Sequence, residues 1–376
     1  MPASKSLDWH FARPQLARHY LDSFHVGLVS AMAFYARRRM GKTEFLLKDL
    51  VPIAQKRGYT VGYCNLWTED QTPLDALMSA IAQMSAPRRM AAKMRAKLLG
   101  PISKVKLGGS AAGYGGASAE VEFKATEKQH IGRLRQAFTA FDKSRNQGLL
   151  LIDEAQVLVE KPHQALEKAL RAHLDIRKDR IKVIFTGSSE DRLRTMFGTE
   201  RNAFYNWARV EPLSLLGSEF VLELTKRANR LTKIPLQSKD ALAAFEALNR
   251  VPEFFRSFLS QYLSHPRDGV KAAVEVCRQT IYAEEGFAAR WKKMLPADRL
   301  ILQLVADGRA DLHGETVLKW LGKMLGLDEP ASRAVPQNAL RRLRQRQVLI
   351  QTELGVYRFE DEAFRDWLLT ENGDDL

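Results

Sequence analysis

A short motif near the N-terminus constrains the fold of this chain more than any other feature. Residues 36–43 read Ala-Arg-Arg-Arg-Met-Gly-Lys-Thr and match the phosphate-loop pattern G-x-x-x-x-G-K-[ST], except that Ala36 replaces the first glycine. Alanine lacks glycine's access to positive φ, which weakens the match. The apolar residues 32–35 suit a buried strand, and residues 44–50 have apolar positions at helical spacing. The motif therefore predicts a strand, a phosphate-binding turn and the start of a helix.

The residues of this turn have distinct predicted roles in nucleotide binding. Unpaired backbone N–H groups and the positive end of the helix dipole suit a polyphosphate, and Gly41 lets the backbone approach it closely. Lys42 can reach the β- and γ-phosphates, and the Thr43 hydroxyl can complete the shell of a magnesium ion. The predicted cofactors are therefore ATP and Mg²⁺. The predicted nucleotide-binding segment comprises Arg38, Arg39, Met40, Gly41, Lys42, Thr43 and Glu44.

An apolar run that ends in two carboxylates supplies the second half of the predicted site. Gly148 to Ile152 are typical of a strand buried on both faces of a parallel sheet, and Asp153 and Glu154 follow directly. Asp153 would hold magnesium, and Glu154 would polarise the attacking water. Such a glutamate favours hydrolysis over phosphoryl transfer to a small molecule. The alternative is a solvated strand end that carries two carboxylates by chance.

A third strand, residues 181–185, is followed by small polar residues. In a parallel sheet its tip is predicted to lie beside the strand of Asp153. A hydroxyl at this tip could sense the γ-phosphate or orient the water, and Thr186 is favoured over Ser188. A simple cap for the next helix explains either hydroxyl equally well.

Three segments of the sequence resemble one family of ATPases. Residues 34–46, 151–156 and 185–188 are similar to the AAA+/STAND-type P-loop ATPases, in the archaeal-type and bacterial "ATP-binding protein" branch. The resemblance covers residues 11–260 and, more loosely, the C-terminal part. It implies an α/β fold with a parallel-sheet αβα P-loop NTPase core, followed by a helical lid and a C-terminal winged helix-turn-helix domain.

The resemblance also implies roles for particular arginines. Residues 11–16 are similar to a short N-terminal box near the adenine, which makes Arg13 a candidate for nucleotide binding. Arg201 stands where the family has an arginine before an aromatic pair, and it could act on the γ-phosphate of a neighbouring subunit. Arg209 is the second choice, and an ordinary surface arginine is the alternative. In the lid, Arg250 stands where relatives often have the glycine of a Gly-x-Pro turn.

Composition places the chain among globular proteins of two or three domains. Its 376 residues are 45% hydrophobic and 27% charged, and no apolar stretch approaches the roughly 20 residues that cross a membrane. The first ten residues lack the apolar segment of a secretory signal, and Cys64 and Cys277 alone cannot form a disulfide framework. These features predict a cytoplasmic protein with buried thiols and no membrane partner.

The charge of the chain favours a polyanionic partner. The formal net charge is +14 at pH 7, which favours contact with nucleic acid. Residues 85–106 contain seven lysines and arginines and no acidic residue, and a glycine-rich run follows. This insertion, residues 85–120, could contact the phosphates of DNA or RNA. It could equally be a solvated helix face beside a flexible loop.

The order of helix and strand signals predicts three parts. Residues 1–217 form the P-loop core, and residues 218–290 form a lid that is helical throughout. Residues 291–376 contain three helices, a hairpin and a last helix, the pattern of a winged helix-turn-helix. The third of these helices carries four arginines that could contact DNA: Arg341, Arg342, Arg344 and Arg346. A winged helix can instead pack against its own protein and bind no nucleic acid.

Together these features predict an ATP-hydrolysing AAA+/STAND-like ATPase. Glu154, Thr186 and Arg201 are the predicted catalytic residues, and Thr43 and Asp153 are the predicted metal ligands. The nucleotide would gate assembly into a homo-oligomer, and the assembly would act on DNA. The alternative is a nucleotide-dependent regulatory or signalling switch that binds a protein partner and no nucleic acid.

Overall fold

The computed structural model describes residues 8–27, 29–68, 71–87, 118–353 and 355–371. The chain divides into two compact units, unit 1 (Met1–Ser214) and unit 2 (Leu215–Leu376). Most of the basic and glycine-rich insertion predicted at residues 85–120 lies outside the described residues, so its contact with nucleic acid stays a prediction. Within the described ranges, no helix combines the length and apolar character that crossing a membrane requires.

A parallel sheet forms the centre of unit 1. Its strands are β1 (Ala31–Tyr35), β2 (Tyr59–Asn65), β3 (Gln147–Asp153), β4 (Ile181–Gly187) and β5 (Arg209–Pro212). They pair in the order β2-β3-β4-β1-β5, and all four pairings are parallel. Leu149 to Ile152 of β3 are completely buried because helices cover both faces of the sheet, which explains the continuous apolar run. The predicted parallel-sheet core and the pairing of β4 with β3 are confirmed.

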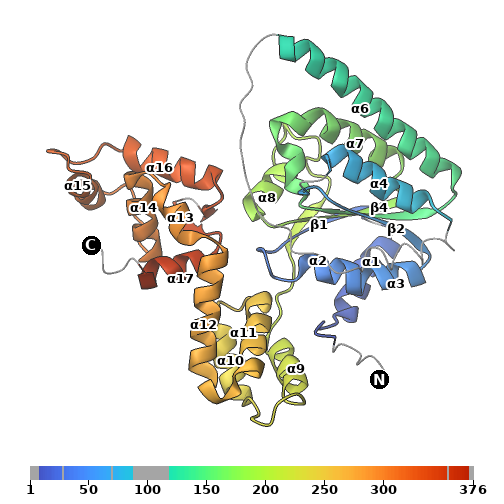
Figure 1. Ribbon diagram of the computed structural model, residues 1–376. Helices are drawn as coiled ribbons and strands as arrows, with labels where there is room; N and C mark the ends of the chain where they lie inside the picture. The colour runs from blue at the N-terminus through green and yellow to red at the C-terminus, as the bar shows by residue number, and fades with distance from the viewer. Residues whose placement is uncertain (1–7, 28, 69–70, 88–117, 354, 372–376) are drawn as a thin grey trace. The chain divides into compact units, whose positions relative to one another are not determined.

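Helices cover the two faces of this sheet and give unit 1 three layers (Figure 1). One face carries α4 (Pro73–Ser85), α6 (Ser118–Lys143) and α7 (Gln164–Ile176). The other face carries α1 (Pro14–His25), α2 (Lys42–Glu44), η1 (Phe45–Leu50) and α3 (Val51–Lys56). Helix α4 can approach β2 closely because Gly62 has no side chain, and a Cβ there would collide with the Ala80 carbonyl. Helix α8 (Glu190–Gly198) follows β4.

The helix after the phosphate loop changes its winding along its length. It starts as the α-helix α2, continues as the π-helix η1 and ends as α3. Pro52, in the first turn of α3, has no N–H to donate to the carbonyl four residues earlier. The wider π turn just before it accommodates the missing hydrogen bond and the proline ring.

The first part of unit 2 is the helical lid. It consists of α9 (Ser218–Ala228), α10 (Ser238–Ala247), α11 (Pro252–Ser264), α12 (Gly269–Glu284) and α13 (Phe287–Lys292). Its core is a cluster of phenylalanines, in which the Phe255 ring lies 5.8 Å from Phe220, 5.5 Å from Phe245 and 5.7 Å from Phe258. The lid therefore has an apolar interior of its own.

The second part of unit 2 is the winged helix-turn-helix. Its helices are α14 (Pro296–Ala306), α15 (Glu315–Met324) and α16 (Ala334–Gln345), and α17 (Glu362–Glu371) follows the hairpin. The antiparallel hairpin is formed by β6 (Leu349–Glu353) and β7 (Val356–Phe359). Three helices followed by a two-stranded wing confirm the predicted fold class for this region.

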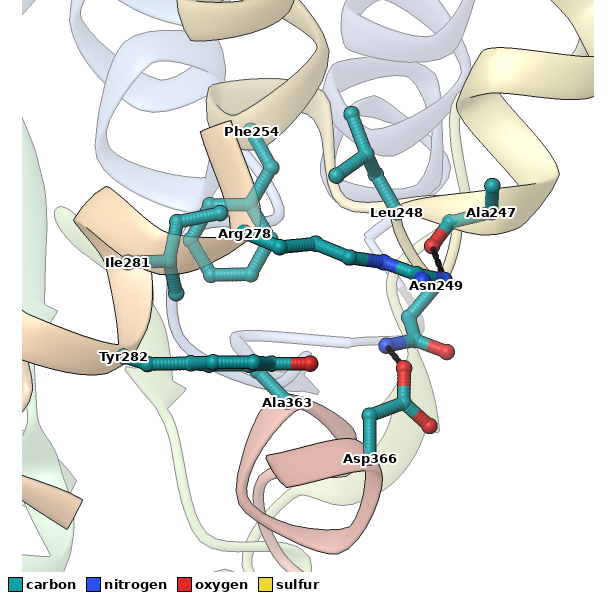
Figure 2. A pocket seen from close by; sticks show the side chains of 9 residues that line it. All are labelled: Ala247, Leu248, Asn249, Phe254, Arg278, Ile281, Tyr282, Ala363 and Asp366. Atoms are coloured by element: carbon teal, nitrogen blue, oxygen red, sulfur yellow. Dashed lines mark hydrogen bonds between the residues drawn. The ribbon is translucent and has the colours of Figure 1, made fainter. Parts of the chain in front are cut away.

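A small cavity lies within unit 2, between the lid helices and α17 (Figure 2). Arg278 donates a hydrogen bond to the Ala247 carbonyl (2.8 Å), and Asn249 donates one to Asp366 (2.6 Å). The second of these bonds joins the lid to the winged-helix part. The cavity has a volume of only about 10 Å³, which is about the space of one water molecule. It is therefore too small for a nucleotide.

Both cysteines agree with the expectation of buried thiols. Cys64 and Cys277 are buried free thiols. Burial and nearby Glu284 raise the pKa of Cys277 to about 11, so this thiol stays protonated near neutral pH. A short 3-10 turn, Lys161–His163, precedes α7.

Candidate functional site

The phosphate loop runs from the end of β1 to the start of α2. Lys42 begins the helix, and the Phe45 N–H bonds to the Gly41 carbonyl at 3.0 Å. The Lys42 side chain is 7% exposed, and its ammonium donates a hydrogen bond to the Ala36 carbonyl at 2.8 Å. The lysine therefore arches back over the loop, with its charge held inside the ring of backbone where phosphates would bind.

The alanine at the start of the motif does not disturb this loop. The left-handed positions are Arg39, with φ of 65°, and Gly41, with φ of 80°, whereas Ala36 has no positive φ. Ala36 instead continues the β1 ladder, because its N–H donates to the Gly187 carbonyl of β4 at 3.3 Å. Glycine's freedom is thus not required at position 36. The conformational strain of the loop lies at Arg39.

Asp153 is the point where three elements of unit 1 converge. One carboxylate oxygen, Oδ2, accepts the Thr43 hydroxyl at 2.8 Å and the Tyr63 hydroxyl at 3.2 Å. The other oxygen, Oδ1, accepts the Thr186 hydroxyl at 2.5 Å and the Glu154 N–H at 3.1 Å. Burial raises the pKa of Tyr63 well above its ordinary value, and the charge of Asp153 adds to this effect. The phenol is therefore neutral and can donate.

Glu154 lies beside Asp153 but faces a different set of donors. Its backbone is left-handed, with φ of 54°. Oxygen Oε2 accepts hydrogen bonds from the Ser188 hydroxyl (2.7 Å), the Ser188 N–H (3.2 Å) and the Gln156 amide (2.5 Å). Oxygen Oε1 lies 3.8 Å from the Lys42 ammonium. The structure thus brings the predicted phosphate lysine and the predicted catalytic carboxylate together at one edge of the sheet.

The donor set around Asp153 fits a magnesium ion. Mg²⁺ prefers oxygen ligands, usually one or two carboxylates together with a hydroxyl, phosphate oxygens and water. Asp153 and Thr43 supply a carboxylate and a hydroxyl 2.8 Å apart. Among the described residues, no group of three or more His, Cys, Asp or Glu side chains could form an all-protein metal site. The site therefore suits a metal that arrives with nucleotide phosphates.

The N-terminal segment packs against the helix that follows the phosphate loop. Arg13 donates to the Gly41 carbonyl (3.2 Å) and to the Ser214 carbonyl (3.1 Å), and its guanidinium lies 4.7 Å from the centre of the Phe45 ring. Burial lowers the pKa of Arg13 from its usual value. The structure therefore places Arg13 at the base of the phosphate loop, where it supports the backbone of Gly41.

His10 forms a second attachment of the same segment. Its ring lies 2.9 Å from Asp49 Oδ1 and 3.5 Å from a Glu44 oxygen. Burial alone would lower the pKa of His10, but hydrogen bonds to both carboxylates and their charges outweigh it and raise the pKa to about 9. Glu44 also pairs with Lys48 at 2.8 Å. The structure thus directs the Glu44 carboxylate to His10 and Lys48.

The remaining predicted nucleotide residues lie around the loop. The Arg38 guanidinium stacks over the exposed Trp67 ring, 4.1 Å from its centre, just after β2. Met40 is buried, so it contributes backbone and packing to the loop. Arg201 is exposed on the segment between α8 and β5, and Arg209 pairs with Glu211 at 3.2 Å.

The arginines of α16 divide into two groups. Arg342 makes a two-pronged hydrogen bond to Asp298 of α14, with distances of 3.0 Å from Nε and 2.6 Å from Nη2. Asp298 is completely buried, so Arg342 neutralises an interior charge and serves the fold. Arg341, Arg344 and Arg346 are exposed. Of the four arginines that the sequence predicts to contact DNA, Arg342 is therefore engaged with a buried carboxylate of unit 2 instead.

Sequence reasoning gave no role to three residues that the structure places in or beside the site. Tyr63 donates to Asp153 from the neighbouring strand, and Gln156 donates to Glu154. His10 pairs with Asp49 on the helix after the phosphate loop. Gly187 makes room for Gln156, because a Cβ there would collide with the side-chain oxygen Oε1 of Gln156. A signal existed only for Gln156, which follows the carboxylate pair closely in the sequence.

Comparison with known proteins finds a shared fold. No family model matches the sequence, and no curated protein matches it. The Walker-type ATPase PABY2304 of Pyrococcus abyssi is 16% identical and has a TM-score of 0.61, with 96% of each chain covered. The ORC2 protein of Aeropyrum pernix, in its ADPNP–ADP complexes, is 15% identical with a TM-score of 0.54, over 96% of this chain and 93% of that one.

At these identities the likeness concerns the fold. Its breadth is nevertheless informative, because it extends through the core, the lid and the winged helix of this chain. The ADP form of the same Aeropyrum pernix protein also matches, at 15% identity and a TM-score of 0.51, over 96% of this chain and 92% of that chain. This chain therefore shares the fold of these solved structures. Its assignment to the AAA+ superfamily and to the STAND subtype stays a prediction.

Proposed function

We propose that this chain binds ATP together with magnesium and hydrolyses the bond to the γ-phosphate. One observation carries the proposal: Thr43 lies 2.8 Å from Asp153, and Lys42 lies 3.8 Å from Glu154, at one edge of the sheet. A hydroxyl, a metal-binding carboxylate, a phosphate-binding cation and a second carboxylate are the groups that hydrolysis of a nucleotide requires. The shared Walker-type ATPase fold supports the same assignment.

The residues divide the work in a simple way. The backbone from Arg38 to Thr43 would surround the phosphates, and the Lys42 ammonium would exchange the Ala36 carbonyl for phosphate oxygens. Thr43 and Asp153 would hold a magnesium ion, which when bound neutralises charge on the β- and γ-phosphates. Thr186 already donates to Asp153, and in the proposal its hydroxyl is also the candidate sensor of the γ-phosphate.

Glu154 would be the residue that activates water. Its carboxylate is buried, and three donors from Ser188 and Gln156 engage one of its two oxygens. A base must reach the proton that it abstracts within hydrogen-bond distance. We therefore expect Glu154 to give up part of this set of donors before turnover, so that its hydrolysis step depends on a local rearrangement.

Arg201 is the proposed catalytic residue contributed by a neighbouring copy of the chain. Its segment is anchored from α7: Glu167 accepts hydrogen bonds from the backbone of Ala203 and Phe204, and the Trp207 indole donates to Asp175 at 3.0 Å. The Phe204 ring packs 5.1 Å from Phe185 of β4. An exposed arginine on so firmly held a segment is suited to reach into the nucleotide site of a neighbouring subunit.

Acting on DNA is the second half of the proposal. The exposed Arg341 and Arg344 lie on α16, the helix that enters the major groove in winged helices of this topology, and the exposed Arg346 follows directly after its end. The net charge of +14 favours the same partner. A cytoplasmic location is part of this proposal.

A regulatory switch with a protein partner is the second candidate. Exposed apolar side chains on and beside α9, namely Leu222, Leu231 and Ile234, favour it, because large apolar side chains left in solvent are available for protein contacts. DNA binding through arginines weakens steeply as salt rises. An ATPase that binds no DNA even at low salt would therefore favour the switch.

Calorimetry with ATP and magnesium tests the central claim. We expect the wild type to take up one ATP per chain and Lys42→Ala to bind at least about a hundredfold more weakly, because a buried charge contact to phosphate is lost. Lys48→Ala is the matched control, since Lys48 is a lysine of the same helix that pairs with Glu44 instead. No ATP uptake by the wild type in the presence of magnesium would refute the proposal.

Mixing variants tests the role of Arg201 in a neighbouring subunit. Lys42→Ala and Arg201→Ala should each be inactive in phosphate release, and a mixture of the two should regain activity where an intact arginine meets an intact site. A mixture as inactive as its components would exclude action between subunits. Mass measurement in ATP and in ADP would show whether the nucleotide controls assembly.

A further inference from the structure

Tyr63 is a residue of the nucleotide site that no sequence motif identifies. It lies on β2, an edge strand, and β2 pairs with β3 so that Tyr63 is opposite Leu151 and Asn65 is opposite Asp153. Tyr63 therefore lies two residues before the register position of Asp153, a rise of roughly 6–7 Å along the strand. A tyrosine side chain spans such a distance, and its hydroxyl reaches Oδ2 of Asp153 at 3.2 Å.

The hydroxyls around Asp153 are not equivalent. Thr43 donates to Oδ2, yet Thr43 belongs to the phosphate loop and is itself a proposed metal ligand. Thr186 donates to the other oxygen, Oδ1. Tyr63 is thus the donor to Oδ2 that comes from outside the phosphate loop and has no proposed metal contact of its own. If the Thr43 hydroxyl bound a metal, Tyr63 would still orient Oδ2.

The position of Tyr63 is fixed from its other side as well. Among the strands that the structure describes, β2 lies at the edge of the sheet, and the Tyr63 N–H donates to the side-chain oxygen of Gln83 on α4 at 3.2 Å. The absence of a side chain at Gly62 lets α4 lie this close. Backbone and hydroxyl are therefore both held, which is what a group that orients a metal ligand requires.

We infer that Tyr63 is a positioning residue of the magnesium site: its hydroxyl holds Oδ2 of Asp153 in the orientation that receives the metal accompanying ATP. The inference rests on the proposed function. It predicts that removal of this hydroxyl weakens metal binding while leaving the nucleotide's own contacts intact. Outer partners of metal ligands typically change metal affinity by about 10- to 100-fold.

The test is Tyr63→Phe, with Tyr59→Phe at the start of the same strand as control. Electron paramagnetic resonance would follow binding of Mn²⁺, in place of Mg²⁺, to each protein saturated with ADP. We expect Tyr63→Phe to bind Mn²⁺ about tenfold more weakly. ADP binding in the presence of a chelator should be unchanged. In turnover, the magnesium concentration for half the maximal rate should rise by the same factor, with kcat at saturating magnesium retained.

Several outcomes would overturn the inference. Unchanged Mn²⁺ affinity in Tyr63→Phe excludes the positioning role, and an equal loss of metal-free ADP binding assigns the residue to general packing. Adding Tyr63→Phe to Asp153→Asn should cause no further loss of Mn²⁺ affinity, and an additive loss means that Tyr63 does not act through Asp153. A wild type that binds neither ADP nor Mn²⁺ refutes the proposed function instead.

A measurement on the wild type keeps the inference testable if the variant folds poorly. Tb³⁺ bound with ADP should show luminescence excited through the absorption band of tyrosine, because a phenol lies against the predicted metal ligand. Absence of a tyrosine component in this excitation spectrum would contradict the placement of Tyr63 beside the metal.

Discussion

The phosphate loop of unit 1 and the arginine-rich helix of unit 2 both stand out in the sequence, but the fold uses them differently. In unit 1, Lys42, Thr43 and Asp153 come together at the carboxyl ends of the parallel strands. There the Thr43 hydroxyl donates to Asp153 at 2.8 Å. In unit 2, one of four adjacent arginines, Arg342, turns inward to the buried Asp298. A motif with fixed spacing specifies the geometry of a site. A run of charged residues does not, because some of its members can form buried ion pairs instead of lying on the surface.

The largest effect is expected in unit 1, from Glu154→Gln. Nucleotide binding should persist, because the amide keeps the shape of the side chain, while turnover falls about a hundredfold to ten-thousandfold with the loss of the base. Phosphate release under single-turnover conditions measures this, and the variant should accumulate the ATP-bound assembly. Glu160→Gln is the control, as Glu160 pairs with Arg192 and has no proposed catalytic role. Retained hydrolysis in pure Glu154→Gln protein would overturn the role of Glu154.

Next in size is the contrast between two arginines of α16. Arg342→Ala should lower the free energy of unfolding of unit 2 by about 3 kcal/mol, because it leaves Asp298 buried without its partner. Arg341→Ala should change stability by less than about 0.5 kcal/mol. It should instead weaken DNA binding and reduce the slope of log affinity against log salt by about 1.

Chemical denaturation and DNA titration at several salt concentrations measure these two effects. If Arg342→Ala were as stable as the wild type, the division of α16 into interior and surface arginines would fail. If Arg341→Ala bound DNA as well as the wild type does, α16 would not be the DNA-contacting helix.

A smaller effect is expected from pH at the N-terminal attachment of unit 1. The pKa of His10 rises from 6.5 to about 9 on folding, so the protonated ring stabilises the folded state beside Asp49 and Glu44. This contribution is complete below pH 6.5, declines as pH rises toward 9 and is lost above it. We expect it to be on the order of 1–3 kcal/mol, reduced by the partial exposure of Glu44.

Urea denaturation of the wild type and of His10→Gln across this pH range measures the contribution. The stability difference between the two proteins should shrink as pH rises through 9. A difference that stays constant with pH would show that His10 acts by packing alone.

The smallest effect concerns backbone strain in unit 2. Arg250 is left-handed, with φ of 54°, a conformation that glycine adopts without strain. Arg250→Gly should therefore raise the free energy of unfolding by about 0.5–1 kcal/mol, and with it the midpoint of thermal unfolding. Arg39 in the phosphate loop is also left-handed, with φ of 65°, but its substitution would mix strain with nucleotide binding. A destabilised Arg250→Gly would show that the Arg250 side chain matters more than its backbone.

Much of the fold could be predicted because its signals are local. Continuous apolar runs identified β1, β3 and β4, since strands covered on both faces need no polar residues. Helical spacing and a hairpin turn identified the winged helix. The strand order β2-β3-β4-β1-β5 could not be predicted from these signals, because it depends on which strands pair across long connections. That order places β4, with Thr186 and Ser188, between the phosphate loop and the carboxylates.

The sequence by itself determined the chemistry of this protein: a glycine, a lysine and a threonine at a strand-to-helix turn, and two carboxylates after a buried strand. These are local relations, set by backbone geometry over a few residues. Only the tertiary structure decided which partners these groups have, namely Tyr63 and Thr186 on Asp153, Gln156 and Ser188 on Glu154, and Asp298 on Arg342. Packing brings together residues that are far apart in the chain, and these contacts cannot be predicted from the spacing of residues in the sequence.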